Sequence, residues 1–287
     1  MGVTSLIAEA RRSLAGSPRR RLGTDPYRRR YSDVRELIAS RVNPTPLTRL
    51  NRVVPAGLEA YLKLEWMNPF GSVKDRTARY LLDGMRERGE LEGRELVEAT
   101  SGNTGIALAR AIAESPAHRG RYAMPNQYGN PDNVRAHYET TGPEIWEQTE
   151  GRVRTFVAGY GTCGTITGVA RFLKERDRGI RVVAVEPQQG HRLPGLKNLE
   201  EAKAPEILDR SVIDDVVRVD DEPAYAMTLR LFREEGLIVG PSSGAIAHAI
   251  AGLDARASGL VVGISPDSGQ KYGSFFADVL EKEGAES

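Results

Sequence analysis

The sequence of 287 residues is poor in several residue types, and each scarcity excludes a class of protein. Its single cysteine, Cys163, cannot form an internal disulfide and favours a reducing compartment. No apolar run approaches the ~20 residues of a membrane-spanning helix, so we expect no membrane partner. The formal net charge of +1 gives no sign of a nucleic-acid partner. The histidines show no metal-ligand spacing, so no metal site is predicted; they are His118, His137, His191 and His248.

Apolar runs typical of buried strands alternate with helical stretches along the chain. Two such runs are VVAV at residues 182–185 and LVVGI at residues 260–264. The alternation predicts an α/β fold in which a parallel sheet is covered on both faces. A chain of this length can bury a substantial core and usually makes one or two domains.

Lys74 stands in a turn of small residues, GSVKDR at 71–76, that leads into a probable helix. Most lysines are solvated surface charges. A lysine held at a tight turn beside apolar residues can instead lose its proton, and the neutral amine can attack an aldehyde to form an imine. Lys74 alone would be interpreted as a surface charge, so its meaning depends on the motifs that accompany it.

A glycine-rich turn, GYGTCGT at 159–165, lies between a short apolar strand at 156–158 and an amphipathic helix at 166–174. Backbone N–H groups of such a turn converge on one point, and the helix N-terminus adds a partial positive charge. Thr162 and Thr165 can add hydroxyl donors. The turn lacks the Gly-Lys-Ser/Thr ending of a nucleotide P-loop and the acidic residue of a dinucleotide site. It predicts a phosphate cradle, although a tight strand-to-helix turn would look the same.

Two further turns into helices carry more polar groups than a helix cap needs. TSGNTG at 100–105 offers hydroxyls and an amide where a cap needs one donor or acceptor, which suits a bound carboxylate or ring hydroxyl. GPSSGA at 240–245 offers a neutral hydroxyl at a helix start, which could also be only a cap.

Taken together, these segments resemble the β-family of pyridoxal-phosphate enzymes (fold type II), and within it the cysteine synthases and cystathionine β-synthases. The resemblance runs in the family's order through NPTPL at 43–47, the lysine segment, TSGNTG, PNQYGNP at 125–131, GTCGT, VGPSSGA at 239–245 and PDSG at 266–269. It implies pyridoxal 5'-phosphate as the cofactor and a two-subdomain parallel-sheet fold of the tryptophan-synthase-β type.

The resemblance also implies roles for the residues at matching positions. Lys74 would hold the cofactor as an imine and later remove the α-proton of the substrate. The other cofactor contacts would be Asn103 to the ring hydroxyl, Gly161, Thr162, Cys163, Gly164 and Thr165 to the phosphate, and Ser242, with Ser243 as second choice, to the pyridine nitrogen. The substrate carboxylate would bind Thr100, Ser101, Thr104 and Gln127. Because a serine beside the pyridine nitrogen is neutral, the ring would be a weak electron sink, which favours β-elimination over transamination or racemisation.

The implied activity is a β-replacement that makes L-cysteine from O-acetylserine or O-phosphoserine and a sulfur donor through an aminoacrylate intermediate. The stretch at 194–201 is similar to a subgroup that accepts O-phosphoserine, with Lys197 in place of an arginine that meets the substrate phosphate. His191 and Arg192 could contribute, and a solvated basic loop is an equal interpretation. Two alternatives stay open: condensation of serine with homocysteine, as in cystathionine β-synthases, and a cofactor-binding protein without turnover.

The chain departs from the family at two places. Between residues 115 and 125 it lacks roughly fifty residues, about two βα units, so we expect a truncated smaller subdomain at about 75–135 unless residues were omitted. A missing lid would impair turnover more than cofactor binding. Cys163 stands where the family usually has glycine or threonine, and its position at a helix N-terminus predicts a lowered thiol pKa.

The first thirty residues are rich in arginine and poor in acids; the arginines are Arg11, Arg12, Arg19, Arg20, Arg21, Arg28, Arg29 and Arg30. Organellar transit peptides have a similar bias, although Glu9 and Asp25 weigh against that interpretation. We expect residues 1–35 to form a basic arm, with a helix over residues 27–39 that packs on a partner subunit. Residues 36–287 would then form the catalytic unit of a cytoplasmic homodimer.

Overall fold

The computed structural model describes residues 31–98, 120–256, 259–274 and 276–277. The chain divides into two units, residues 1–33 and 34–287, and nearly all described residues belong to the second. The TSGNTG motif lies outside the described residues, and with it the predicted site residues Thr100, Ser101, Asn103 and Thr104. Within the described ranges, no helix is both long and apolar enough to cross a bilayer.

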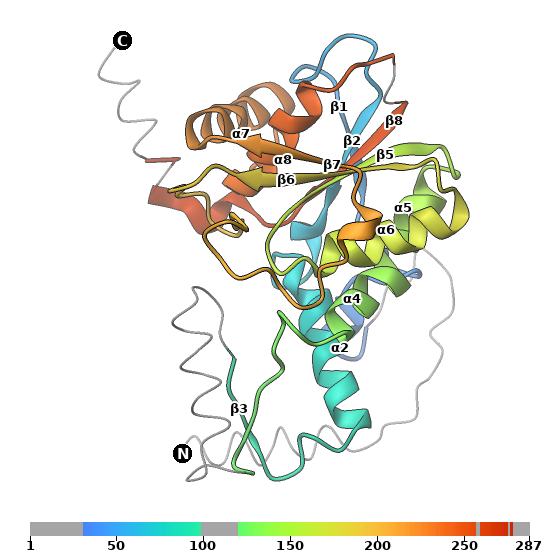
Figure 1. Ribbon diagram of the computed structural model, residues 1–287, viewed down its shortest axis with the longest axis vertical. Helices are drawn as coiled ribbons and strands as arrows, with labels where there is room; N and C mark the ends of the chain where they lie inside the picture. The colour runs from blue at the N-terminus through green and yellow to red at the C-terminus, as the bar shows by residue number, and fades with distance from the viewer. Residues whose placement is uncertain (1–30, 99–119, 257–258, 275, 278–287) are drawn as a thin grey trace. The chain divides into compact units, whose positions relative to one another are not determined.

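A six-stranded sheet forms the centre of the second unit (Figure 1). Its strand order is β1 (Leu47–Leu50), β2 (Ala60–Leu64), β8 (Leu260–Ser265), β5 (Val153–Gly159), β6 (Arg181–Pro187) and β7 (Asp215–Val219). Strand β1 pairs antiparallel with β2, and all other neighbours are parallel. Strands β6 and β8 are buried almost without interruption, as a parallel sheet covered on both faces requires. The predicted α/β fold with a parallel sheet is confirmed.

Helices cover both faces of this sheet. On one face α7 (Asp221–Glu235) and α8 (Pro241–Ala251) pack with Val183 and Val261, and on the other α5 (Gly142–Gln148) and α6 (Gly164–Arg176) pack with Val182 and Val262. Neighbouring residues of one strand thus enter opposite apolar clusters, because side chains of a strand alternate between its faces. This arrangement brings the loops before α6 and α8, both predicted site segments, to the carboxyl ends of the central strands.

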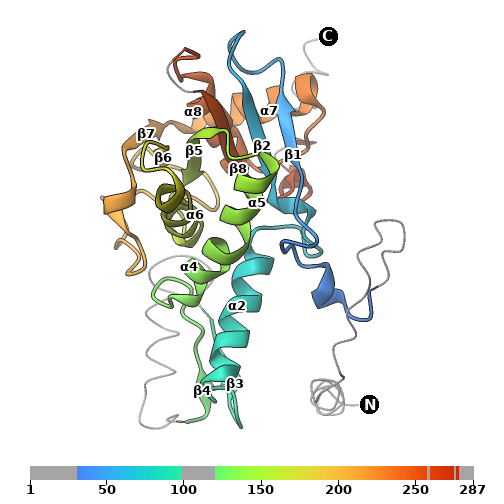
Figure 2. The same cartoon turned by 90° about the vertical axis from the view of Figure 1, so that its right-hand side faces the viewer.

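The remaining elements include the helix that begins at Lys74 and its neighbours. Helix α2 (Lys74–Glu87) lies beside α4 (Asp132–Ala136), and Figure 2 shows the pair side by side. The helices touch so closely that a Cβ on Gly84 would lie 2.0 Å from the Asp132 carboxylate. After α4 the chain continues through a π-helical turn, η4 (His137–Thr141), into α5. Strands β3 (Glu95–Leu96) and β4 (Tyr122–Ala123) form a separate parallel pair. The short 3-10 turns are η1 (Val34–Leu37), η2 (Glu65–Met67), η5 (Arg210–Val212) and η6 (Gly269–Tyr272).

A buried ion network fixes the first turn of α2. The Arg76 guanidinium contacts both carboxylate oxygens of Glu65, at 2.7 and 2.9 Å, and both of Glu144, at 2.6 and 2.7 Å. Lys63 completes the network with an Nζ–Oε2 distance of 2.7 Å to Glu144. All four side chains are at most 1% exposed. The network joins α2 to β2, η2 and α5, so the position of Lys74 is fixed by residues from distant parts of the chain.

The prediction of a helix over residues 27–39 is wrong within its described part. Residues 31–39 contain only the 3-10 turn η1. The backbone beyond it finds partners outside a helix: the Ala39 N–H donates to Asn68 Oδ1 at 2.9 Å, and Ser40 forms an isolated bridge with Asn43. These local contacts satisfy the groups that a continuing helix would need.

Candidate active site

Lys74 is the first residue of α2, and the backbone before it is tied to the segment after β8. Ser72 forms an antiparallel bridge with Asp267, and the Val73 N–H donates to the Pro266 carbonyl at 2.8 Å. The Lys74 N–H in turn meets Ser72 Oγ at 3.3 Å. The lysine and PDSG motifs, almost 200 residues apart in the sequence, therefore form one structural unit.

The Lys74 amine combines solvent access with an environment that disfavours its charge. Its side chain is exposed, yet loss of hydration among the surrounding protein atoms lowers its pKa. The Asp267 carboxylate raises the pKa in part, and the smaller effect of the Lys271 charge lowers it further. Hydration is lost only in part at this exposed side chain, but the balance still lowers the pKa. The neutral amine, which is the nucleophilic form, is thereby favoured.

The serine segment at the start of α8 lies beside the same PDSG segment, at residues 266–269. The Gly240 N–H donates to the Asp267 carbonyl at 3.1 Å, and a Cβ on Gly240 would lie 2.3 Å from Asp267 Oδ1. The Ser243 hydroxyl is engaged with Ser265 Oγ at 2.9 Å. The Ser242 residue is 3% exposed, and its hydroxyl takes part in none of the side-chain hydrogen bonds between described residues. Of the two predicted serines, Ser242 is the one with a neutral hydroxyl available for a ligand.

Asp267 carries a second unsatisfied polar atom at this place. Its Oδ2 accepts from the Tyr272 hydroxyl at 2.7 Å, while the buried Oδ1 has no hydrogen-bond partner among the described residues. Burial raises the pKa of this carboxyl. Polar groups that lack partners in a protein interior usually belong to a site that binds a ligand or does chemistry.

The glycine-rich turn between β5 and α6 has the geometry of a cradle. Cys163 adopts the left-handed conformation with φ of 65°, and α6 begins at the next residue. A Cβ on Gly161 would lie 2.7 Å from the Gly195 carbonyl oxygen, and one on Gly164 would lie 2.1 Å from Asn133 Oδ1. Both glycines are therefore required by close approach of neighbouring chain. The first backbone N–H groups of a helix such as α6 have no partner within the helix, and an anion is stabilised at such a helix start.

Two residues that the sequence-based prediction missed support this cradle from behind. Asn133 Nδ2 donates to Thr162 Oγ1 at 3.1 Å, and His137 Nε2 lies 3.2 Å from Thr165 Oγ1. Asn133 is 0% exposed and His137 1% exposed. From the sequence, His137 is considered only as a metal ligand, and no suitable spacing is found. The signal that could have found the pair is an asparagine and a histidine four residues apart in a segment that is buried.

The prediction of a lowered thiol pKa at Cys163 is wrong. Burial raises the pKa of this thiol to about 12, and the nearby charges of Arg210, Lys197 and Lys74 lower it only in part. The side chain is 3% exposed. Desolvation of the thiolate therefore outweighs the helix N-terminus, and the thiol is neutral.

The predicted substrate residues are brought together only in part. Gln127 is buried, and its carbonyl accepts from Asn133 Nδ2 at 2.7 Å, which places it behind the cradle. Lys197 is linked to the cradle strand through its N–H, which donates to the Tyr160 carbonyl at 2.7 Å. Its Nζ lies 4.8 Å from the centre of the Tyr128 ring. Arg192, by contrast, bonds through its N–H to Asp221 at the start of α7.

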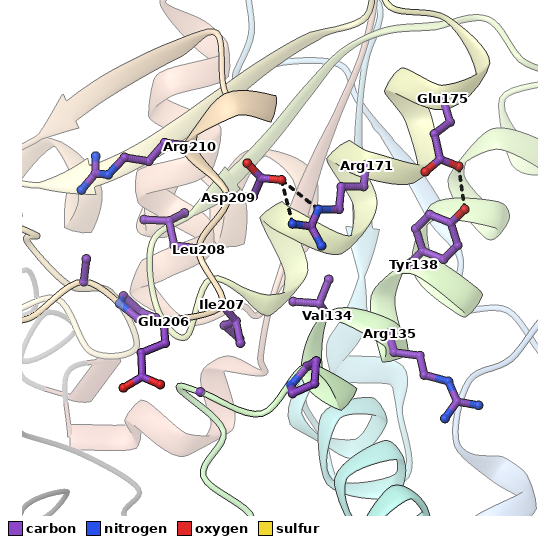
Figure 3. A pocket seen from close by; sticks show the side chains of 14 residues that line it. Val134, Arg135, Tyr138, Arg171, Glu175, Glu206, Ile207, Leu208, Asp209 and Arg210 are labelled. Atoms are coloured by element: carbon purple, nitrogen blue, oxygen red, sulfur yellow. Dashed lines mark hydrogen bonds and ion pairs between the residues drawn. The ribbon is translucent and has the colours of Figure 1, made fainter.

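A separate pocket of ≈ 940 Å³ opens on the outer side of α4 and η4 (Figure 3). Val134, Arg135 and Tyr138 face it, together with the segment 204–210. Two contacts join lining residues to one another: Arg171 binds Asp209 at 2.8 Å, and the Tyr138 hydroxyl donates to Glu175 at 2.6 Å. None of the predicted site residues lines it, so we place the candidate active site at Lys74 and not here.

The described residues fit pyridoxal phosphate. They supply an amine with a lowered pKa, a glycine-rich turn that leads into the N-terminus of α6, and a neutral hydroxyl at the buried residue Ser242. An imine-forming cofactor with a phosphate group and a ring nitrogen needs these three kinds of group. The predicted contact from Asn103 to the ring hydroxyl lies outside the described residues.

Comparison with known proteins points the same way. The pyridoxal-phosphate dependent enzyme family matches residues 38–115 and 110–266, in two segments that meet at 110–115. The chain is 37% identical over 279 residues to cysteine synthase B of Escherichia coli, covering 80% of this chain and 92% of that protein. It is 34% identical over 300 residues to an O-acetylserine dependent cystathionine beta-synthase of Bacillus subtilis, covering 84% of this chain and 95% of that protein.

A solved structure agrees with these relatives. O-acetylserine sulfhydrylase isoform 3 from Entamoeba histolytica superposes with a TM-score of 0.73 at 28% identity, covering 90% of this chain and 92% of the other. The similarity in fold extends over nearly the whole of both chains and includes the sheet that carries the candidate site. The chain therefore belongs to the family of pyridoxal-phosphate dependent enzymes, and its cofactor is pyridoxal phosphate.

Proposed function

We propose that this chain is a cysteine synthase, which makes L-cysteine from an activated serine and a sulfur donor by β-replacement. One observation carries the proposal: the segment with Lys74 and the segment with Ser242 both contact the PDSG segment at 266–269. The pKa of the Lys74 amine is lowered at this place. The relatives add support, because cysteine synthase B and an O-acetylserine sulfhydrylase are among them.

The roles of the residues follow from their chemistry. When bound, pyridoxal phosphate supplies an electron sink that eases loss of the α-proton and of the β-substituent. Lys74 carries the cofactor and, once released, takes the α-proton at Nζ. Thr162 and Thr165 hold the phosphate with the N–H groups of the turn. Ser242 faces the pyridine nitrogen as a neutral partner, which favours elimination.

The first experiment records the visible absorption of the purified protein with pyridoxal phosphate, before and after O-acetylserine, and then measures cysteine formed from added sulfide. We expect a band from lysine-bound cofactor that changes with the substrate. Lys74→Ala should lose the band while its unfolding temperature stays that of the parent. Lys203→Ala, at a side chain that is 80% exposed, is the matched control.

Three results would reject the proposal. Full turnover in Lys74→Ala would remove Lys74 from its role. A normal cofactor band without cysteine production from either O-acetylserine or O-phosphoserine would favour a cofactor-binding protein without turnover. Cystathionine production from serine and homocysteine at a higher kcat/KM than cysteine production would favour the condensing enzyme instead.

We further infer that O-phosphoserine is accepted alongside O-acetylserine, with Lys197 at the substrate phosphate. The Lys197 ammonium has no carboxylate partner among the described residues, and its charge acts on the Cys163 thiol inside the cradle turn. A cation near the cradle without a carboxylate partner suits the phosphate group of the substrate, in addition to that of the cofactor. Lys197→Met should lower kcat/KM for O-phosphoserine by about tenfold, which is one charged hydrogen bond, and leave the value for O-acetylserine within twofold. Equal losses for both substrates would contradict this role.

We also propose that the smaller subdomain, at about residues 75–135, is shortened. The alignment with the Escherichia coli protein extends over 279 residues but uses 80% of this chain, which is about 230 of its 287 residues. The family model matches in two segments that overlap at 110–115, next to residues 115–125, where the shortening is predicted. A shortened lid should leave cofactor affinity intact while kcat falls below that of a cysteine synthase B assayed alongside; an equal kcat would contradict it.

The remaining proposals concern assembly. We propose a cytoplasmic homodimer in which residues 1–35 form a basic arm against the partner subunit, with residues 36–287 as the catalytic unit. Light scattering after size exclusion should give twice the mass of the 31.4 kDa chain. Deletion of the arm should shift the mass toward the monomer, and an unchanged dimer would contradict the arm's role.

A further inference from the structure

Three helices meet behind the phosphate cradle through a closed set of polar side chains. Thr77 comes from α2, Asn133 from α4, and Thr162 and Thr165 from the turn and first residues of α6. His137, at the start of the π-helical turn, lies among them. Thr77, Asn133 and His137 are each at most 3% exposed. Every proton in such a buried set has to be assigned to one partner, so the direction of each hydrogen bond can be worked out.

The Asn133 amide has one possible orientation. Its nearest contact, at 2.7 Å, is the Gln127 carbonyl, which can only accept, so Nδ2 must point there. The second Nδ2 hydrogen is then donated to Thr162 Oγ1 at 3.1 Å. Oδ1 lies on the other side and accepts from Thr77 Oγ1 at 3.1 Å. The Thr162 hydroxyl oxygen therefore accepts a hydrogen bond from the protein interior.

For the His137 ring we infer the tautomer from its neighbours. Thr77 has a single hydroxyl hydrogen and gives it to Asn133, so toward the ring, at 3.4 Å, it can only accept. We therefore assign the ring hydrogen to Nε2, between Thr77 Oγ1 and Thr165 Oγ1, the latter at 3.2 Å. With the hydrogen on Nε2, Nδ1 is the acceptor toward the Thr141 hydroxyl at 2.9 Å. Burial lowers the pKa of His137 to about 3, so the ring stays neutral over the working range of pH.

We propose that Asn133 and His137 are positioning residues that turn both threonine hydroxyls of the cradle into donors toward the cofactor phosphate. Each hydroxyl accepts a hydrogen from behind, and its own single hydrogen is left to point into the cradle. A phosphate can only accept at its ionised oxygens, so a cradle set in this way is complementary to it before it binds. The inference rests on the proposed role of the Thr162 and Thr165 turn. Neither Asn133 nor His137 needs to touch the phosphate.

The π-helical turn is an independent sign that the arrangement is built. A helix that leaves the α pattern loses regular hydrogen bonds, and such turns are retained mostly at functional sites. Here the irregular turn spans His137 to Thr141, the two residues joined by the contact between Nδ1 and the Thr141 hydroxyl. Gly164 adds a second sign, because a Cβ there would collide with Asn133.

The test compares the affinity of the apoprotein for pyridoxal phosphate with its affinity for pyridoxal, which lacks the phosphate. His137→Leu removes the Nε2 donor and should weaken binding of pyridoxal phosphate by about tenfold or more, the effect of one charged hydrogen bond. Binding of pyridoxal should change by less than about threefold. His137→Gln can place an N–H near the Nε2 position and should restore most of the loss. His248→Leu, at an exposed histidine of α8, is the matched control.

A double-mutant cycle separates positioning from a purely structural role. If His137 acts through Thr165, then His137→Leu should cost almost nothing further in a Thr165→Val background. If His137→Leu does not fold, Thr141→Val is an isosteric second variant that removes the donor to Nδ1 and should weaken phosphate binding in the same sense. Equal losses for both ligands, additive losses in the cycle, or unchanged pyridoxal phosphate affinity would overturn the proposal. Failure of the proposed function looks different, because the unmodified protein would then form no lysine-bound cofactor with either ligand.

Discussion

Removal of the Arg76 side chain should be among the most destabilising single changes in this protein. Arg76 binds two buried carboxylates, each through two hydrogen bonds, and of these two carboxylates Lys63 contacts only Glu144. The network carries two positive and two negative charges, so Arg76→Met leaves one negative charge uncompensated in the interior. Breaking a buried pair in this way costs about 3–5 kcal/mol. For a unit of this size the unfolding temperature should fall by about 6–20 °C.

The dependence on pH shows whether the loss is electrostatic. Burial alone would raise the pKa of Glu65, but the Arg76 charge and its hydrogen bonds lower that pKa to about 2. A carboxyl with a lowered pKa stabilises the fold above its unfolded value and loses that contribution as the pH falls through its folded value. In Arg76→Met the Glu65 carboxyl, which has lost its charged partner, can take a proton below about pH 5. The difference in unfolding free energy between parent and variant should therefore shrink between pH 7 and pH 4.

The assay is urea unfolding of the apoprotein followed by circular dichroism at both pH values. Arg230→Met is the control, because Arg230 is 44% exposed and pairs with Glu234 on the surface of α7. It should cost no more than about 0.5 kcal/mol. Arg76→Lys, which keeps the charge but not the planar two-sided geometry, should lie between the two. A loss under about 1 kcal/mol for Arg76→Met, or one that is the same at pH 4 and pH 7, would refute the reasoning.

Three further predictions concern the candidate site. Asp267→Asn and Lys271→Met should move the pH midpoint of cofactor capture by Lys74 in opposite directions, because the Asp267 carboxylate raises the Lys74 pKa and the Lys271 charge lowers it. The first variant should react at lower pH and the second at higher pH in stopped-flow absorbance, and shifts of the same sign would contradict the assignment. Cys163→Gly should stabilise the protein by up to about 1 kcal/mol in thermal unfolding, because Cys163 has φ of 65° where glycine has no steric penalty; a loss of stability would mean that packing of the thiol outweighs the strain. Gly164→Ala should reduce pyridoxal phosphate affinity at least tenfold in absorbance titration, because its methyl would lie 2.1 Å from an amide oxygen, and unchanged affinity would show that the amide can move away.

The parts of the fold that the sequence predicts are those with local causes. Strands β5, β6 and β8 each contain an apolar run, at residues 156–158, 182–185 and 260–264, and a run of that kind is buried in most parallel sheets. The turn into α6 needs glycines because the chain passes close to a carbonyl and an amide, and glycine is visible in the sequence. Helix starts are equally local, so α2, α6 and α8 begin near the predicted positions.

The rest depends on contacts between distant residues. Arg76 looks like a surface charge in a helical segment, and only the fold brings Glu65 and Glu144 to it. The Cys163 thiol has a raised pKa because of its depth, which the helix position alone does not reveal. Asn133 and His137 are informative only once their neighbours from α2 and α6 are known. Polar residues that must be satisfied in the interior are thus the part of the site least accessible from the sequence.

The strand order has a consequence for the synthesis of the protein. Strand β2 ends at residue 64 and pairs with β8, which begins at residue 260, so 195 residues separate the two partners. At about 5–20 residues per second, a ribosome needs roughly 10–40 s to make this interval. During that time the apolar edge of β2 and the segment that carries Lys74 have no strand to complete them. Pairings between distant segments also form slowly, so newly made chains should depend on chaperones until the last strand emerges.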